Sequence, residues 1–121
     1  MKKLLVVLLI LVTCLSGCEK KPQGSDTVRF AVLAPLTGNY AEFGKAFKVA
    51  MGMAADEINA AGGINGKTLE LEIFDSKGDA TESSDLARQI VEDKSYVGAI
   101  GDFSSGASMA DAPIFGDAEM V

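Results

Sequence analysis

Two adjacent serines, Ser104 and Ser105, are the residues whose place in the sequence is best suited to bind a ligand. They lie between a short apolar run, residues 96–101, and the expected start of a helix. The first backbone N–H groups of a helix have no partner inside the helix, and the helix dipole favours an anion there. A serine hydroxyl at this point either caps the helix or joins those N–H groups in holding an anion such as a carboxylate. The residues alone leave both roles open.

Other side chains are expected near the same edge. Phe43 lies at the start of an earlier expected helix, where it is either a core residue or the wall of a ligand pocket. Asp75 and Asp79 follow an expected strand and could in principle ligate a cation. Aspartates in such loops usually accept hydrogen bonds from the backbone, so we interpret them as caps and solvated loop residues.

The composition excludes several kinds of chemistry. The 121 residues include 11 Lys and Arg, 17 Asp and Glu and no His, with a formal net charge of −6. Without histidine there is no histidine base and no histidine metal ligand. Both cysteines, Cys14 and Cys18, lie near the N-terminus, which rules out a cysteine-based zinc site in the body. The acidic balance disfavours nucleic acid as a partner, and no metal or cofactor is expected.

The N-terminal residues have the pattern of a secretory signal. Two lysines precede an apolar run over 4–15, which is shorter than the roughly 20 residues that span a bilayer. The last residue of this run, Leu15, begins the stretch Leu-Ser-Gly-Cys over 15–18, which resembles the lipobox of bacterial lipoproteins. That resemblance implies a signal peptide over 1–17, lipidation of Cys18 and a flexible tether over 18–27. A plain signal peptide or an N-terminal anchor helix is the alternative.

The elements that must position these residues alternate between strand and helix. Strands are expected over 28–34, 68–74 and 96–101, and helices over about 41–61 and 80–93, with a third helix that opens from the loop 102–106 and runs to about 115. This alternation predicts an α/β fold with a doubly wound parallel sheet. The alternating strand 68–74 is expected to be an edge strand or a half-exposed one, and the apolar strand 96–101 is expected to be buried. Ligands of such sheets bind at the carboxyl ends of the strands, here the loops 35–41, 75–79 and 101–106.

Two further patterns lie in the first helix and in the turn that follows it. The first helix carries an apolar stripe that we expect to face the sheet, formed by Phe43, Ala46, Phe47, Ala50, Ala54, Ile58 and Ala61. Residues 61–68, AGGINGKT, match a loosened phosphate-binding loop. Because a phosphate loop runs from strand to helix and this stretch runs from helix to strand, we interpret it as a helix cap and turn.

The part of the chain that follows the expected tether, residues 28–121, resembles the branched-chain amino acid (Leu/Ile/Val) binding proteins of ABC transporters. The stretches that carry the resemblance are 32–38, 41–44, 57–67, 74–75, 99–101, 104–107 and 112–114. It implies a periplasmic-binding-protein fold of type I, with residues 28–121 as an incomplete N-terminal lobe. It also implies that Ser105 binds the ligand α-carboxylate with help from Ser104, and that Phe103 and Phe43 wall the side-chain pocket.

The function expected from this resemblance is binding without catalysis. The protein is expected to be a lipid-anchored, extracytoplasmic solute receptor for a branched-chain or other amino acid, or a similar small amide. Its partners would be that ligand, an ABC permease and ATPase complex, and the membrane through Cys18. One alternative is a truncated product of the same family that binds nothing, and a less favoured one is a lipid-anchored α/β enzyme.

Overall fold

The structure is a computed structural model that describes residues 27–121. The expected signal peptide, Cys18 and nearly all of the tether lie outside the described residues. Within 27–121, no helix is long and apolar enough to cross a membrane.

Three parallel strands form the sheet, in the order β2-β1-β3. They are β1 (Thr27–Ala34), β2 (Thr68–Asp75) and β3 (Tyr96–Ile100). β1 pairs with β2 along its whole length, and it pairs with β3 only from Arg29 to Val32. The last four residues of β1 are buried, as expected for a central strand that is covered on both faces.

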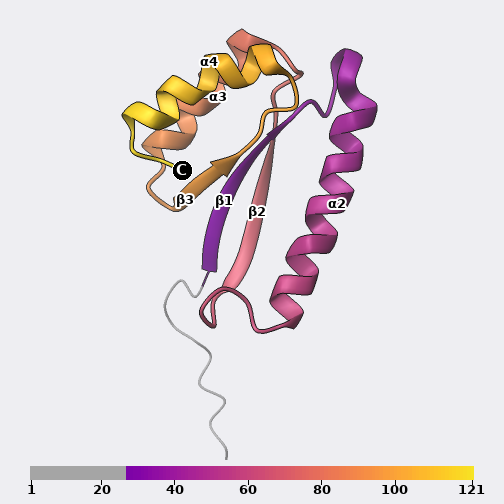
Figure 1. Ribbon diagram of the computed structural model, residues 1–121, viewed down its shortest axis with the longest axis vertical. Helices are drawn as coiled ribbons and strands as arrows, with labels where there is room; N and C mark the ends of the chain where they lie inside the picture. The colour runs from indigo at the N-terminus through magenta and orange to yellow at the C-terminus, as the bar shows by residue number, and fades with distance from the viewer. Residues whose placement is uncertain (1–26) are drawn as a thin grey trace, which may run out of the picture.

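Helices cover both faces of this sheet. The long helix α2 (Ala41–Ala60) lies on one face, while α3 (Ala80–Glu92) and α4 (Ser105–Asp117) lie side by side on the other (Figure 1). A short 3-10 turn, η1 (Gly38–Tyr40), leads into α2. The predicted doubly wound α/β fold is confirmed, and the element bounds agree with the sequence to within about two residues.

The rotation of α2 on the sheet differs from the prediction. The sheet-facing side carries Gly44, Met51, Ala55 and Asn59, whereas the predicted stripe is largely exposed. Gly44 fixes this rotation, because a Cβ there would lie 2.1 Å from the carbonyl oxygen of Pro35. Two hydrogen bonds from the side chain of Asn59 then join the helix to β2. Its Oδ1 accepts from Leu69 N at 2.7 Å, and its Nδ2 donates to Leu69 O at 2.9 Å. The expected orientation of the stripe was therefore wrong.

The strand β3 is less buried than predicted. Tyr96 and Gly98 are buried, but Val97 is 57% exposed because β3 forms one edge of the described sheet. On the free side of β3, Ala99 N donates a hydrogen bond to the carbonyl oxygen of Val121 at 2.7 Å. The other edge strand, β2, was correctly predicted.

Candidate functional site

The loops after β1 and β2 are held together at the carboxyl edge of the sheet by one carboxylate. Asp75 accepts hydrogen bonds from Leu36 N at 2.8 Å, Thr37 N at 3.1 Å and Lys77 N at 3.0 Å. The hydroxyl of Thr37 also donates to it, at 2.6 Å. We call this arrangement the Asp75 clamp.

The role of the Asp75 clamp is structural, because the carboxylate bonds backbone N–H groups of the two loops. Burial alone would raise the pKa of the Asp75 carboxyl, but the hydrogen bonds from Thr37, Lys77 and Leu36 favour the ionised form, and the net pKa is lowered. Among residues 27–121, no group of three or more acidic or cysteine side chains is placed to hold a metal ion. Asp79 caps α3 as expected, accepting from Thr81 N at 2.9 Å and Glu82 N at 3.0 Å.

Ser104 is the N-cap residue of α4. Its hydroxyl oxygen accepts a hydrogen bond from Ala107 N at 3.1 Å and donates to the carbonyl oxygen of Gly78 at 3.3 Å. The Ser104 hydroxyl therefore caps α4 and ties the loop after β3 to the loop after β2.

Ser105, the first residue of α4, is placed differently. Its side chain is exposed at the carboxyl edge of the sheet. In the part of the chain that the structure describes, no acceptor meets its hydroxyl or the backbone N–H groups of Ser105 and Gly106. Two N–H groups and one hydroxyl at a helix N-terminus can together hold an anion.

The two phenylalanines that the sequence analysis selected lie against each other. Phe103 stacks on Phe43 with ring centroids 4.7 Å apart and an interplanar angle of 16°. Tyr40 and Phe47 also contact Phe103, at 5.4 and 5.7 Å between centroids. These four rings, which we call the aromatic wall, remain partly exposed, and Phe43 is 54% exposed.

Sequence reasoning did not select Tyr40 and Phe47 as site residues. Phe47 follows Phe43 by four positions and so lies on the same side of α2. This spacing was visible in the sequence, where it was interpreted as core packing.

A second set of polar side chains lies just behind the start of α4. Ser83 on α3 donates to Asp111 Oδ2 on α4 at 2.8 Å, and its oxygen is also 3.4 Å from Asp102 Oδ2 in the β3–α4 loop. Burial raises the pKa of the Asp111 carboxyl, and the nearby Asp102 raises it further, while the hydrogen bond from Ser83 acts in the opposite direction. The sequence analysis missed this group, although Asp111 is the only charged residue between Ser105 and Gly116.

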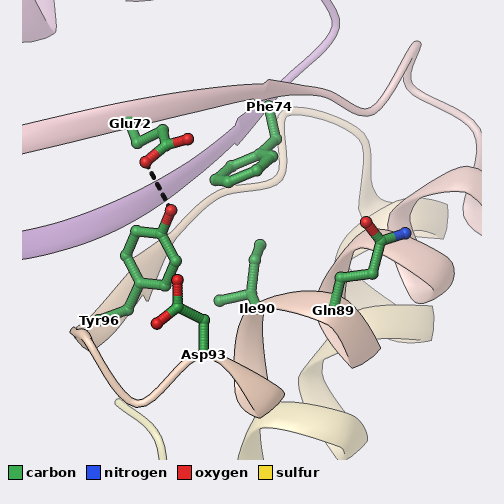
Figure 2. A pocket seen from close by; sticks show the side chains of 6 residues that line it. All are labelled: Glu72, Phe74, Gln89, Ile90, Asp93 and Tyr96. Atoms are coloured by element: carbon green, nitrogen blue, oxygen red, sulfur yellow. Dashed lines mark hydrogen bonds between the residues drawn. The ribbon is translucent and has the colours of Figure 1, made fainter.

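A hollow of about 130 Å³ lies away from these loops, on the α3 side of the sheet (Figure 2). It is lined by Glu72, Phe74, Gln89, Ile90, Asp93 and Tyr96. The Tyr96 hydroxyl donates to Glu72 Oε2 at 2.6 Å, and Arg29 Nη2 is 2.5 Å from the same oxygen. Burial and the bond to Glu72 raise the pKa of Tyr96 to about 12. Because its acids already have partners in the protein, this hollow is an unfavourable place for a cationic ligand.

The chain matches the family model described as periplasmic binding protein over residues 27–121. A leucine-, isoleucine-, valine-, threonine- and alanine-binding protein of Pseudomonas aeruginosa is 33% identical over 65% of this chain and 21% of its own length. A Leu/Ile/Val-binding protein homolog of Brucella abortus is 35% identical over 74% of this chain and 24% of its own length. The chain thus spans about a quarter of the length of these curated relatives.

Solved structures agree with this match. A branched-chain amino acid ABC transporter protein of Rhodospirillum rubrum superposes with a TM-score of 0.76 at 38% identity, over 78% of this chain and 27% of its own. The substrate-binding protein LivJ of Streptococcus pneumoniae, solved with isoleucine, has a TM-score of 0.73 at 30% identity over the same shares. The three-stranded sheet and its helices match part of one lobe of the type I fold. The chain belongs to the branched-chain amino acid binding proteins of the periplasmic binding protein family, whose members bind solutes and are not enzymes.

Proposed function

We propose that the chain forms part of an amino-acid site in the extracytoplasmic substrate-binding component of an ABC importer. The observation that carries this proposal is the Ser105 hydroxyl with two backbone N–H groups at the start of α4, which meet no partner within residues 27–121 and lie beside the aromatic wall. The two curated relatives described above are named as amino-acid-binding proteins, and LivJ was solved with isoleucine.

The chemistry of this edge suits an amino acid with an apolar side chain. The α-carboxylate would accept hydrogen bonds from the Ser105 hydroxyl and the first N–H groups of α4. Such bonds to a charged group contribute about 1.5–3 kcal/mol each, so a carboxylate is held without Lys or Arg. The aromatic wall, with Phe43 and Phe103 at its centre, would contact the ligand side chain.

The proposal also includes a second lobe, the transporter partners and a lipid anchor, which are inferred from the relatives and from the N-terminal sequence. In this proposal the ligand lies between two lobes, and residues 28–121 contribute part of the first. The protein delivers the ligand to an ABC permease and ATPase complex and is anchored through a lipid on Cys18, after removal of residues 1–17. Labelling cells with an alkyne fatty acid tests the anchor, because Cys18→Ser should abolish the labelled band. A labelled Cys18→Ser protein would refute it.

Calorimetry on the full-length gene product with leucine, isoleucine and valine tests the site. Ser105→Ala should weaken binding by about tenfold or more, since it removes one hydrogen bond to a charged group. Ser84→Ala is a control, because the Ser84 hydroxyl donates to the carbonyl oxygen of Ala80 within α3 at 2.8 Å, with a longer contact of 3.5 Å to the carbonyl oxygen of Ala110, and lies outside the proposed site.

The outcomes separate the proposal from its main alternative. Unchanged affinity in Ser105→Ala would remove Ser105 from the site. No heat with any amino acid would favour a family member that binds nothing. The structural observation behind that alternative is that Val49 and Met53 of α2 are 63% and 60% exposed within residues 27–121.

A further inference from the structure

The Ser83 hydroxyl lies between two carboxyl groups, Asp111 and Asp102, at the distances given above. Ser83 is fully buried, and Asp111 is only 3% exposed. A serine hydroxyl carries one hydrogen and can donate to only one of the two carboxyls. If both were ionised, an oxygen of one carboxylate would face a lone pair of the serine, which is most costly at Asp111, since Asp111 is buried and Asp102 is only half-buried.

A single additional proton resolves this conflict. With the proton on Asp111, the Asp111 carboxyl donates to Ser83, and Ser83 donates to Asp102, so every contact has one donor and one acceptor. The groups that face Asp111 are the uncharged Ser83 from α3, the Asp102 side chain from the β3–α4 loop, and the backbone N–H groups of Asp111 and Ala112 on α4, which act in favour of the ionised form. Burial and this neighbouring negative charge both favour the protonated form of Asp111.

Asp102 connects this chain of hydrogen bonds to the start of α4. Its backbone N–H donates to Ser108 Oγ at 3.2 Å, and that hydroxyl donates back to the carbonyl oxygen of Asp102 at 3.0 Å. Its Oδ1 accepts from Ser104 N at 3.4 Å. The Asp102 side chain therefore contacts Ser104, the residue that caps α4 and precedes Ser105.

We propose that Asp111 carries a proton in a hydrogen-bonded relay with Ser83 and Asp102 that positions Ser104 and Ser105, and that loss of this proton weakens carboxylate binding at the start of α4. We call these three residues the Asp111 relay, and they are positioning residues. Losing the proton breaks one contact of the relay. It also adds a second negative charge close to the proposed anion site, so the affinity for a carboxylate falls as the pH rises. The ligand in this inference rests on the proposed function, whereas the coupling between the relay and the loop does not.

The first test measures the loop without any ligand. In the ¹⁵N-labelled full-length gene product, the amide shifts of Ser104 and Ser105 are followed from about pH 4, near the usual pKa of an aspartate, to about pH 8. We expect them to titrate together with the Asp111 carboxyl and to lose this titration in Asp111→Asn, whose amide keeps a permanent donor. The exposed Asp117 lies on the same helix, so Asp117→Asn is the matched control and should keep the titration.

The second test measures leucine affinity by calorimetry over the same pH range. The wild type should lose about fivefold in affinity as the pH rises, at the lower end of typical coupling between sites, and Asp111→Asn should remove this loss. Ser83→Ala should weaken binding at low pH, where the relay is intact in the wild type. If the amide shifts couple to Asp111 but leucine does not bind, the relay stands and the proposed function fails. Serine amides that titrate identically in wild type and Asp111→Asn would overturn the relay.

Discussion

Asp75 and Asp111 both hold loops at the carboxyl edge of the sheet, but their surroundings shift their acidity in opposite directions. Asp75 receives three backbone N–H groups and one hydroxyl, and its pKa is lowered. Asp111 is more deeply buried, faces a second carboxyl through Ser83, and has a raised pKa although the Ser83 hydroxyl and the backbone N–H groups of Asp111 and Ala112 act in the opposite direction. Both groups are at least partly removed from water. The number of donors that reach the carboxyl, set against the charges nearby, decides whether it is held as an anion or as an acid.

This difference separates two kinds of support for the same edge. The Asp75 clamp joins the loops after β1 and β2 through a permanent negative charge, and it should be insensitive to pH near neutrality. The Asp111 relay supports the loop after β3 through a proton on Asp111, and it should respond to pH. A carboxylate bound at Ser105, as proposed, would lie next to the support whose charge can change.

The largest expected effect comes from removing the Asp75 clamp. Asp75→Ala leaves the N–H groups of Leu36, Thr37 and Lys77 without their acceptor, and we expect a loss of about 2–3 kcal/mol in the free energy of unfolding. Chemical denaturation measures this loss. Asp75→Asn keeps one carbonyl acceptor and should lose clearly less. A loss below about 0.5 kcal/mol for Asp75→Ala, the usual size for a surface substitution, would show that the clamp does not hold the loops.

A smaller effect, with a characteristic pH dependence, is expected for the relay. A raised folded-state pKa means that Asp111 contributes stability below its unfolded pKa, and that this contribution is lost as the pH rises through the folded value. For Asp75 the lowered pKa means the reverse, with stability present above the unfolded pKa and lost as the pH falls through the folded value.

Asp111→Asn should therefore be more stable than wild type at neutral pH, by about 1 kcal/mol, the value of one buried hydrogen bond. The difference should shrink as the pH is lowered and Asp111 becomes protonated. Thermal denaturation across pH measures this difference in stability, with Asp117→Asn as the control for removing an exposed carboxylate from the same helix. A variant that is less stable than wild type at neutral pH would mean that the ionised form of Asp111 is the one that the fold prefers.

The order and bounds of the elements could be predicted from the sequence because each has a strong local signal. The apolar run of β1 ends at Pro35, and Gly62 and Gly63 follow the end of α2, with Gly63 at a φ of 73°. The rotation of α2 could not be predicted by the same means. Its apolar residues cover a broad arc, and the contact of Gly44 with Pro35 selects which part of that arc meets the sheet.

The site was predictable where it depends on position along the chain. Ser104 and Ser105 follow β3 and begin α4, as the spacing indicated. The direct stacking of Phe43 on Phe103 and the meeting of Ser83 with Asp111 depend on how helices pack across the sheet, which a local pattern does not contain. The isolated charge of Asp111 in an otherwise uncharged stretch of α4 was the one available signal for the relay.

The unequal pairing of β1 has a consequence for local unfolding. The backbone of β1 bonds β2 over eight residue pairs, from Thr27↔Thr68 to Ala34↔Asp75, whereas its pairing with β3 covers only Arg29–Val32 and includes a bulge after Arg29. Closing the longer loop to β3 costs only slightly more entropy, because that cost grows slowly with length. The β1–β3 pairing is therefore weaker than the β1–β2 pairing mainly because it has fewer residue pairs. We expect β3 to open at a lower free energy than β2 within the described sheet. The loop that carries Ser105 follows this strand, so fraying of β3 would dismantle the proposed carboxylate site while β1 and β2 remain paired.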